Sequence, residues 1–280
     1  MTSMIQKVCR AAVAASLATI GALAAVSAQA QDLPALPKDI KDKGELRVGV
    51  KCDSPPFGML DPGGKPIGIE VEMAKRIAEY AFGSAAKAQL VCVTSEARIP
   101  SLQGNKIDMI LATLGKFPER QKVIDFTEYY FWGESNVLVP KDSSVKTLAD
   151  LKGKNILIVK GGSQATWFEK NIPEVQLTRL NTTGDSIQAL LQGRGDGFVG
   201  DGMLVSSLAV NYPQLRIVQG GLDEGFNGIG VRKGETELTA YLDAALKKLR
   251  AEGFYDKVVK QFVTDKGVEA QTLKGFQPKP

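Results

Sequence analysis

The sequence predicts an α/β protein with two lobes, each built on a sheet of parallel strands that helices cover. Short apolar runs of strand type alternate with helical segments, and the alternation occurs as two series along the chain. No long low-complexity segment separates the two series. Because ligands of such sheets bind outside the carboxyl ends of the strands, we expect a binding cleft between the lobes.

The first series is expected to hold three strands and two helices. The strands are residues 46–50, 89–93 and 107–111, and the helices are residues 70–81 and 98–102. Met73, Ile77 and Ala81 fall on one face of the longer helix, as the helical period requires. The polar segment before this series, residues 31–44, contains several prolines and lysines and is expected to be a flexible lead-in.

The second series has the same alternation. Its strands are expected at residues 155–159, 175–180, 197–199 and 215–218, and its helices up to residue 170 and at residues 185–191 and 203–210. Two extended apolar segments, residues 136–139 and 229–231, are expected to be the crossover strands of a hinge. They would return the final helices, residues 235–251 and 254–262, to the first lobe. Lobe 1 is therefore predicted at residues 45–136 and 228–280, and lobe 2 at residues 137–227.

The N-terminus has the pattern of a secretory signal peptide. Lys7 and Arg10 precede an apolar, alanine-rich run at residues 11–26, and Ala28-Gln29-Ala30 is a small-x-small cleavage site. The alternative is a membrane anchor, but the run is shorter than the roughly 20 residues that a span needs. We expect residues 1–30 to be removed by cleavage after Ala30 and the mature protein to be periplasmic.

Composition excludes several classes of function. The chain has 35 basic and 31 acidic residues, and two of the basic residues lie in the predicted signal peptide, so the mature chain carries 33 − 31 = +2. This balance argues against nucleic acid as a partner. The chain has no histidine, which removes Ser-His-Asp and Cys-His catalysis and His-ligated zinc. We expect no catalytic residue, metal site or cofactor.

Two cysteines follow the predicted signal peptide, Cys52 and Cys92. Each lies near the end of a predicted strand, and an oxidising compartment permits a disulfide between them. Two buried free thiols are the alternative, and the sequence does not decide between them, because it does not give the Cα separation that a disulfide requires.

Polar side chains follow most of the predicted strands, on the side where a cleft is expected. Side chains that converge in this way suit a small polar ligand. The candidates are Lys51, Asp53, Arg98, Thr113, Arg120, Lys160, Ser163, Gln164 and Asp201.

Three of these features fit an amino-acid zwitterion. The guanidinium of Arg120 can bind a carboxylate through two hydrogen bonds, and the loop at residues 161–164 can offer N–H groups at a helix start. Asp201 can accept from an ammonium group. For each residue alone the alternative is a solvated charge or a helix cap, and the combination favours a binding site.

The chain resembles the periplasmic polar amino-acid-binding proteins of ABC transporters, the family 3 extracellular solute-binding proteins. The resemblance covers nearly all of residues 45–262 and rests on motifs at residues 46–50, 55–57, 68–72, 99–102, 118–126, 148–154, 193–196 and 231–234. It implies a two-lobed periplasmic-binding-protein fold, with two Rossmann-like lobes and a two-strand hinge. It also implies that Arg120 grips the α-carboxylate, Asp201 takes the α-ammonium and Phe57 covers the ligand side chain. Core packing is the alternative for Phe57.

Within the family the chain looks most like the glutamate and aspartate binders. Thr94-Ser95, Arg98-Ile99-Pro100 and the basic Lys51 carry this resemblance, which implies that Lys51 and Arg98 neutralise a second ligand carboxylate. The alternative is a structural role for both, bonding the backbone or Asp53. Residues 113–115, Thr-Leu-Gly, depart from the Thr-x-Thr common in the family, which puts the identity of the ligand in doubt.

The resemblance implies a monomeric binding protein that closes on a small amino acid and delivers it to an inner-membrane permease. Another polar amino acid or an opine is the alternative ligand. A sensor that presents the ligand to a receptor would have the same pocket. An enzyme similar to the cyclohexadienyl dehydratases is a further alternative, with Glu96 or Glu134 as the acid.

Overall fold

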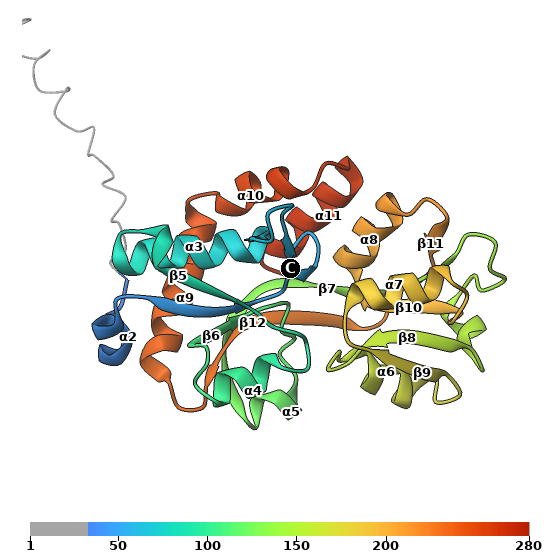
Figure 1. Cartoon of the computed structure of the whole chain (residues 1–280), viewed down its shortest axis with the longest axis horizontal. Helices are drawn as coiled ribbons and strands as arrows, with labels where there is room; N and C mark the ends of the chain where they lie inside the picture. Colours follow the sequence, from blue (N-terminus) through green and yellow to red (C-terminus); the bar gives the residue numbers. More distant parts are fainter. Residues whose placement is uncertain (1–32, 280) are drawn as a thin grey trace, which may run out of the picture. The chain divides into compact units, whose positions relative to one another are not determined.

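The computed structural model describes residues 33–279, which form two α/β lobes joined by two long strands, β7 and β12 (Figure 1). One continuous sheet path, β5-β1-β6-β12-β7-β10-β8-β9, runs through both lobes, and β11 pairs with β7 beside this path. The lobe that contains β1, β5 and β6 is called lobe 1, and the lobe that contains β8, β9 and β10 is called lobe 2.

In lobe 1, β1 (Leu46–Val50) lies between β5 (Ala88–Cys92) and β6 (Met109–Leu111), and both pairings are parallel. Successive residues of β6 point to opposite faces, as they must in a strand. Met109 and Leu111 therefore join the core on one face, whereas Ile110 joins the core on the other. The covering helices are α3 (Ile69–Phe82), α4 (Arg98–Gln103), α9 (Thr236–Ala251) and α10 (Phe254–Phe262).

Lobe 2 repeats this arrangement. Its central strand β8 (Asn155–Val159) pairs in parallel with β9 (Gln176–Leu180) and β10 (Gly197–Asp201). Two hydrophobic clusters cover the opposite faces of this sheet. Its helices are α6 (Gln164–Asn171), α7 (Thr183–Leu191) and α8 (Gly202–Asn211).

The hinge consists of antiparallel strands, which the expectation of purely parallel sheets did not include. β7 (Ile124–Pro140) is a single strand of 17 residues that pairs with β12 (Glu224–Arg232) as far as Glu134. From Ser135 onward β7 pairs with β10 of lobe 2, and it also pairs with the short β11 (Leu215–Ile217). The chain therefore passes between the lobes without a break in hydrogen bonding, and the hinge is a sheet rather than a loop.

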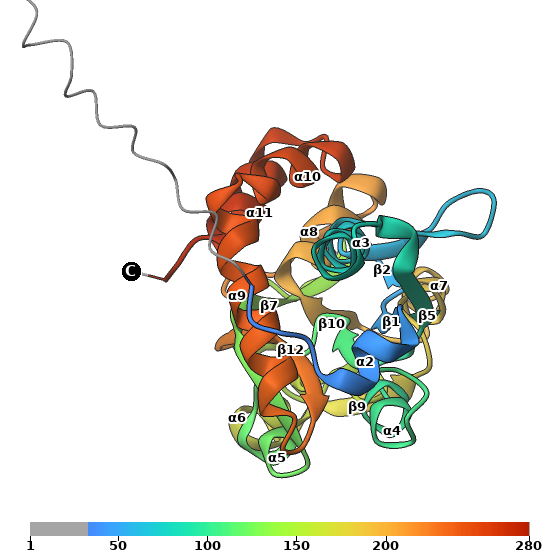
Figure 2. The ribbon, with the colours of Figure 1, turned by 90° about the vertical axis from the view of Figure 1, so that its left-hand side faces the viewer.

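Several segments of lobe 1, the short helix α5 among them, differ from the sequence-based expectation. Part of the lead-in is helix α2 (Lys38–Lys43), because Ile40 is an apolar residue that the lobe 1 core can bury. The segment after β1 is a small sheet of its own, and a helix that was not expected, α11, follows α10 (Figure 2). The bounds are β2 (Asp53–Ser54), β3 (Gly58–Leu60), β4 (Pro66–Ile67), α5 (Pro118–Gln121) and α11 (Lys266–Phe276).

The predicted signal peptide at residues 1–30 lies outside the described residues. Within residues 33–279, no helix combines the length and the apolar character that crossing a membrane would take.

Candidate functional site

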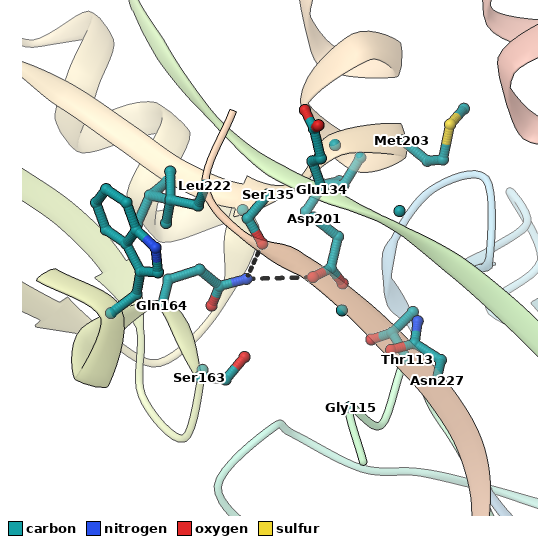
Figure 3. A pocket seen from close by; sticks show the side chains of 18 of the residues that line it. Thr113, Gly115, Glu134, Ser135, Ser163, Gln164, Asp201, Met203, Leu222 and Asn227 are labelled. Carbon is teal, nitrogen blue, oxygen red and sulfur yellow. Dashed lines mark hydrogen bonds between the residues drawn. The ribbon is translucent and has the colours of Figure 1, made fainter. Parts of the chain in front are cut away.

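A cavity of about 740 Å³ lies between the two lobes, at the carboxyl ends of their central strands. A volume of this size is typical of small-molecule sites. Most of the binding residues predicted from the sequence line it, and some are drawn in Figure 3. These residues are Lys51, Arg98, Thr113, Arg120, Ser163, Gln164 and Asp201.

Arg120, in α5 of lobe 1, reaches across the cleft. Its Nη1 donates to the carbonyl oxygen of Gly115 at 2.9 Å, and its Nη2 donates to the carbonyl oxygen of Gly161 in lobe 2 at 3.0 Å. Burial and the nearby charge of Arg98 lower the pKa of Arg120 to about 9, although Asp201 opposes this. A guanidinium has five N–H donors, so the two carbonyls leave capacity for a carboxylate, whose negative charge would favour the charged form of Arg120.

Asp201 ends β10 and stands at the N-cap of α8. The Nε2 amide of Gln164 donates to Asp201 Oδ1 at 3.2 Å and to Ser135 Oγ at 3.0 Å (Figure 3). Burial raises the pKa of Asp201, and the positive charges of Arg98, Lys51 and Arg120 oppose this rise. A carboxylate that is desolvated in this way gains from an additional cationic partner, such as an ammonium group.

Arg98 and Glu70 hold the turn that carries Thr113. Arg98 Nη1 donates to the carbonyl oxygens of Ala112 and Thr113, and the backbone N–H of Thr113 donates to the Glu70 carboxylate at 2.9 and 3.1 Å. Thr113 has φ 47°, a left-handed conformation that is costly for a residue other than glycine. The two buried side chains therefore stabilise a strained turn that places Thr113 at the cavity wall.

Arg98 also retains unused hydrogen-bonding capacity. It is buried, and among the described residues its Nε atom finds no hydrogen-bond partner. Burial lowers the pKa of Arg98, while the negative charge of Asp201 opposes this. The bonds to Ala112 and Thr113 show that Arg98 has the structural role considered from the sequence, and its position on the cavity wall leaves a ligand role open.

Lys51 is already paired within the protein. Its Nζ lies 2.7 Å from Asp53 Oδ1 and donates to Ser95 Oγ at 3.2 Å. Asp53 Oδ2 in turn accepts from the backbone N–H of Thr183 at 3.2 Å, at the first turn of α7 in lobe 2. Asp53 does not line the cavity. It links Lys51 of lobe 1 to a helix N-terminus of lobe 2, where a negative charge is favoured.

Besides Asp53, two predicted site residues do not line the cavity. Phe57 is fully buried in the lobe 1 core, with its ring 5.0 Å from that of Phe131, and it does not line the cavity. The residue of this segment that lines the cavity is Ser54. Lys160 is not a lining residue either, although its neighbours Val159 and Gly161 are. Phe57 and Lys160 both lie in turns that follow strands, where the alternation of side chains along a strand no longer predicts which way a side chain points.

Several residues of the site were not found from the sequence. The hinge strand β7 contributes Trp132 and Ser135 to the cavity wall, together with Glu134, which the sequence suggested only as the acid of the enzyme alternative. Glu70 does not line the cavity but fixes Thr113, and the Tyr130 hydroxyl also donates to its carboxylate. The sequence could have indicated the role of Glu70. This residue shares the buried face of its helix with Met73 and Ile77, and a carboxylate that is buried in this way needs hydrogen-bond partners.

The two lobes touch next to Arg120. Gly161 has φ 76°, and a Cβ atom built on it would lie 2.7 Å from the backbone of Ser95 and Glu96 in lobe 1. Only glycine permits both this backbone conformation and this approach. This close approach of the Gly161 loop to lobe 1 occurs together with the hydrogen bond from Arg120 to Gly161, so both belong to the same position of the two lobes.

The structure bonds Cys52 to Cys92, with a Cα–Cα distance of 5.6 Å. Parallel pairing of β1 with β5 aligns Val50 with Cys92, and Cys52 follows two residues later. Cys52 is adjacent to Lys51, so the disulfide ties the segment that carries Lys51 to β5.

Residues 46–265 match the family model of the bacterial extracellular solute-binding proteins, family 3. This chain belongs to that family. Curated relatives of this solute-binding protein include the ABC transporter glutamine-binding protein of Bacillus subtilis, which is 33% identical over 232 residues. That alignment covers 82% of this chain and 85% of the relative. The L-arginine-binding protein of Pseudomonas aeruginosa is 30% identical over 251 residues, which cover 84% and 94% of the two chains.

Solved structures agree with the family assignment. A cysteine-binding protein from Campylobacter jejuni is 33% identical and superposes with a TM-score of 0.77, over 81% of this chain and 94% of that one. The solute-binding protein therefore has the two-lobed periplasmic-binding-protein fold. The relatives are named for glutamine, arginine and cysteine, so they do not single out an acidic amino acid.

Proposed function

We propose that this solute-binding protein captures a polar amino acid in the cleft and delivers it to the permease of an ABC transporter. The observation that carries the proposal is the pair of opposite charges on facing lobes, Arg120 and Asp201, both on the wall of one cavity. Arg120 would bind the α-carboxylate and Asp201 the α-ammonium. Because the two groups belong to different lobes, a zwitterion gains both contacts only when the lobes approach, which couples binding to closure.

Two details of the charge distribution support different ligand side chains. Lys51, Arg98 and Arg120 all act on the carboxylate of Asp201, and this concentration of basic groups supports glutamate or aspartate. The ion pair between Lys51 and Asp53 supports glutamine or another neutral side chain instead, because it already neutralises one cation. We propose an acidic amino acid first, with a neutral polar amino acid as the second candidate.

The predicted signal peptide and the extracellular nature of the family support export to the periplasm, where such a protein would meet its permease. An enzyme on the same fold has less support. Glu134 lines the cavity, but Glu96 is exposed and does not. A turnover assay with prephenate and arogenate separates this alternative, since a binding protein leaves both unchanged.

Calorimetric titration of the mature protein, freed of carried-over solute, with a panel of amino acids tests the proposal. Tight binding of glutamate or aspartate that Arg120→Ala and Arg98→Ala weaken by about 2–5 kcal/mol would support the acidic ligand. Tight binding of glutamine alone would support the second candidate and would agree with the roles proposed for Arg120 and Asp201. If no amino acid binds, the amino-acid assignment is wrong.

A further inference from the structure

Helix α11 lies beyond the segment that matches the family model, which ends at residue 265. Its start is well defined, because the side chain of Asp265 accepts hydrogen bonds from the backbone N–H groups of Gly267 and Val268, both at 2.9 Å. Gln271, Lys274 and Gly275 of this helix line the cavity between the lobes. A helix outside the family segment thus forms part of the wall of the site.

The C-terminal end of α11 is anchored in lobe 1. The ring of Phe276 stacks on that of Tyr255 at 4.3 Å and meets the ring of Phe131 edge-on at 5.0 Å. Gly275 allows α11 to lie directly on the hinge strand, because a Cβ atom there would lie 2.3 Å from the Phe131 ring and 2.7 Å from the Trp132 carbonyl oxygen. The helix therefore rests on β7 immediately before this strand enters lobe 2.

The other face of α11 contacts lobe 2. Met203 belongs to α8, two residues after Asp201, yet its side chain is 3% exposed and packs in the hydrophobic cluster of lobe 1. The hydroxyl of Thr272 lies 3.7 Å from the sulfur of Met203, and Ser206 Oγ donates to Gln271 Oε1 at 3.4 Å. Figure 1 shows α11 beside α8, above β7.

We propose that α11 is a clasp between the lobes, which holds Met203 of α8 in the hydrophobic cluster of lobe 1. Rotation of lobe 2 about β7 and β12 changes the separation between α8 and α11, because only α8 moves with lobe 2. The contact is present in the arrangement in which Arg120 reaches Gly161, so it stabilises that arrangement. The clasp shifts the equilibrium between open and closed lobes, and through this population it sets the apparent affinity for solute.

This inference does not depend on which solute the cleft takes. The test measures the distance between the lobes without added solute, by double electron–electron resonance between spin labels at Lys122→Cys in lobe 1 and Glu169→Cys in lobe 2. Both positions are exposed: Lys122 directly follows α5, the helix of Arg120, and Glu169 lies in α6. The mature protein, expected to start after Ala30, lacks Cys9, and its two cysteines, Cys52 and Cys92, are joined to each other and do not take up label.

Met203→Ala removes the side chain that enters lobe 1, and Gly275→Ala pushes α11 away from β7. We expect both to move the distance distribution toward more open lobes. Met203→Leu, which refills the same space, should restore the wild-type distribution. Ala270→Ser, on the exposed side of the same helix, is the matched control and should leave it unchanged. If closure becomes about ten times rarer, the affinity for glutamate or glutamine falls about tenfold.

Circular dichroism and thermal melting establish that each variant is folded. If Met203→Ala or Gly275→Ala does not fold, Gln271→Ala provides the milder test, because this side chain is exposed. Folded variants with the wild-type distance distribution would overturn the clasp. If the wild type binds neither glutamate nor glutamine, the ligand assignment fails, whereas the distances still decide on the clasp.

Discussion

Arg120 of lobe 1 and Gly161 of lobe 2 meet across the cleft, where Arg120 Nη2 donates to the Gly161 carbonyl oxygen at 3.0 Å. The bond joins the guanidinium proposed to hold a ligand carboxylate to a loop that begins the first helix of lobe 2. Closure and ligand binding therefore share one side chain, and both residues can be tested by substitution.

Arg120→Lys should weaken solute affinity by about 1.5–3 kcal/mol, the value of a hydrogen bond to a charged group. Lysine keeps the positive charge, but it lacks the planar guanidinium whose N–H groups can donate to Gly115, Gly161 and a carboxylate at the same time. Titration calorimetry measures the change. Arg76→Lys, at a partly exposed arginine in α3 that pairs with Glu79, is the control. Equal affinities for the wild type and Arg120→Lys would show that Arg120 does not bind the ligand.

Gly161→Ala should impair closure, because the added methyl group would meet the backbone of Ser95 and Glu96. Part of the effect is the cost of a left-handed backbone for alanine, about 1 kcal/mol. Gly153→Ala supplies the control, since Gly153 has φ 73° and open space around its Cβ position. Both variants should lose similar stability in chemical denaturation, and only Gly161→Ala should lose solute affinity. Parallel losses of affinity in the two variants would exclude the contact between the lobes as the cause.

Glu70 should make the stability of the protein depend on pH. Burial raises the pKa of Glu70 from 4.5 to about 7, a rise that hydrogen bonds from Tyr130 and Thr113 and the charge of Arg98 oppose. Between these two values the folded state keeps a proton that the unfolded state has lost, so the contribution to stability falls as pH rises and then levels off. The full difference corresponds to about 3 kcal/mol.

Chemical denaturation between pH 4.5 and pH 8 measures this effect. Glu70→Gln should remove the part of the pH dependence that falls in this window, whereas Glu72→Gln, a half-exposed residue of the same helix, should keep it. A Glu70→Gln profile parallel to that of the wild type would contradict the assignment.

The disulfide should contribute to stability through the unfolded state. Cys52 and Cys92 are 40 residues apart, and closing a loop of this length should stabilise the fold by about 2–4 kcal/mol. The double variant Cys52→Ser/Cys92→Ser should therefore unfold at lower denaturant concentration. The wild type with a reducing agent is the matched comparison. Unchanged midpoints in both would mean that the bond does not stabilise the fold.

The sequence predicted the regular elements well, because their signals are local. The strand at Leu46–Val50 and the helix at Phe254–Phe262 have the expected bounds, since apolar periodicity and flanking polar residues define both. Helix α11 was missed because it has few apolar residues, and its buried face becomes apparent only when Phe276 meets the aromatic rings of lobe 1.

By itself, the sequence determined the alternation of strands and helices, the family motifs, and the places of Asp201 at the end of a strand and of Arg120 a few residues beyond another. Only the tertiary structure decided which neighbouring side chain faces the cavity, as it places Ser54 there and Phe57 in the core. It also decided that Lys51 is paired with Asp53 and that α11 touches α8. The reason is that periodicity reports which residues are buried, whereas the partner of a buried group depends on segments far away in the chain.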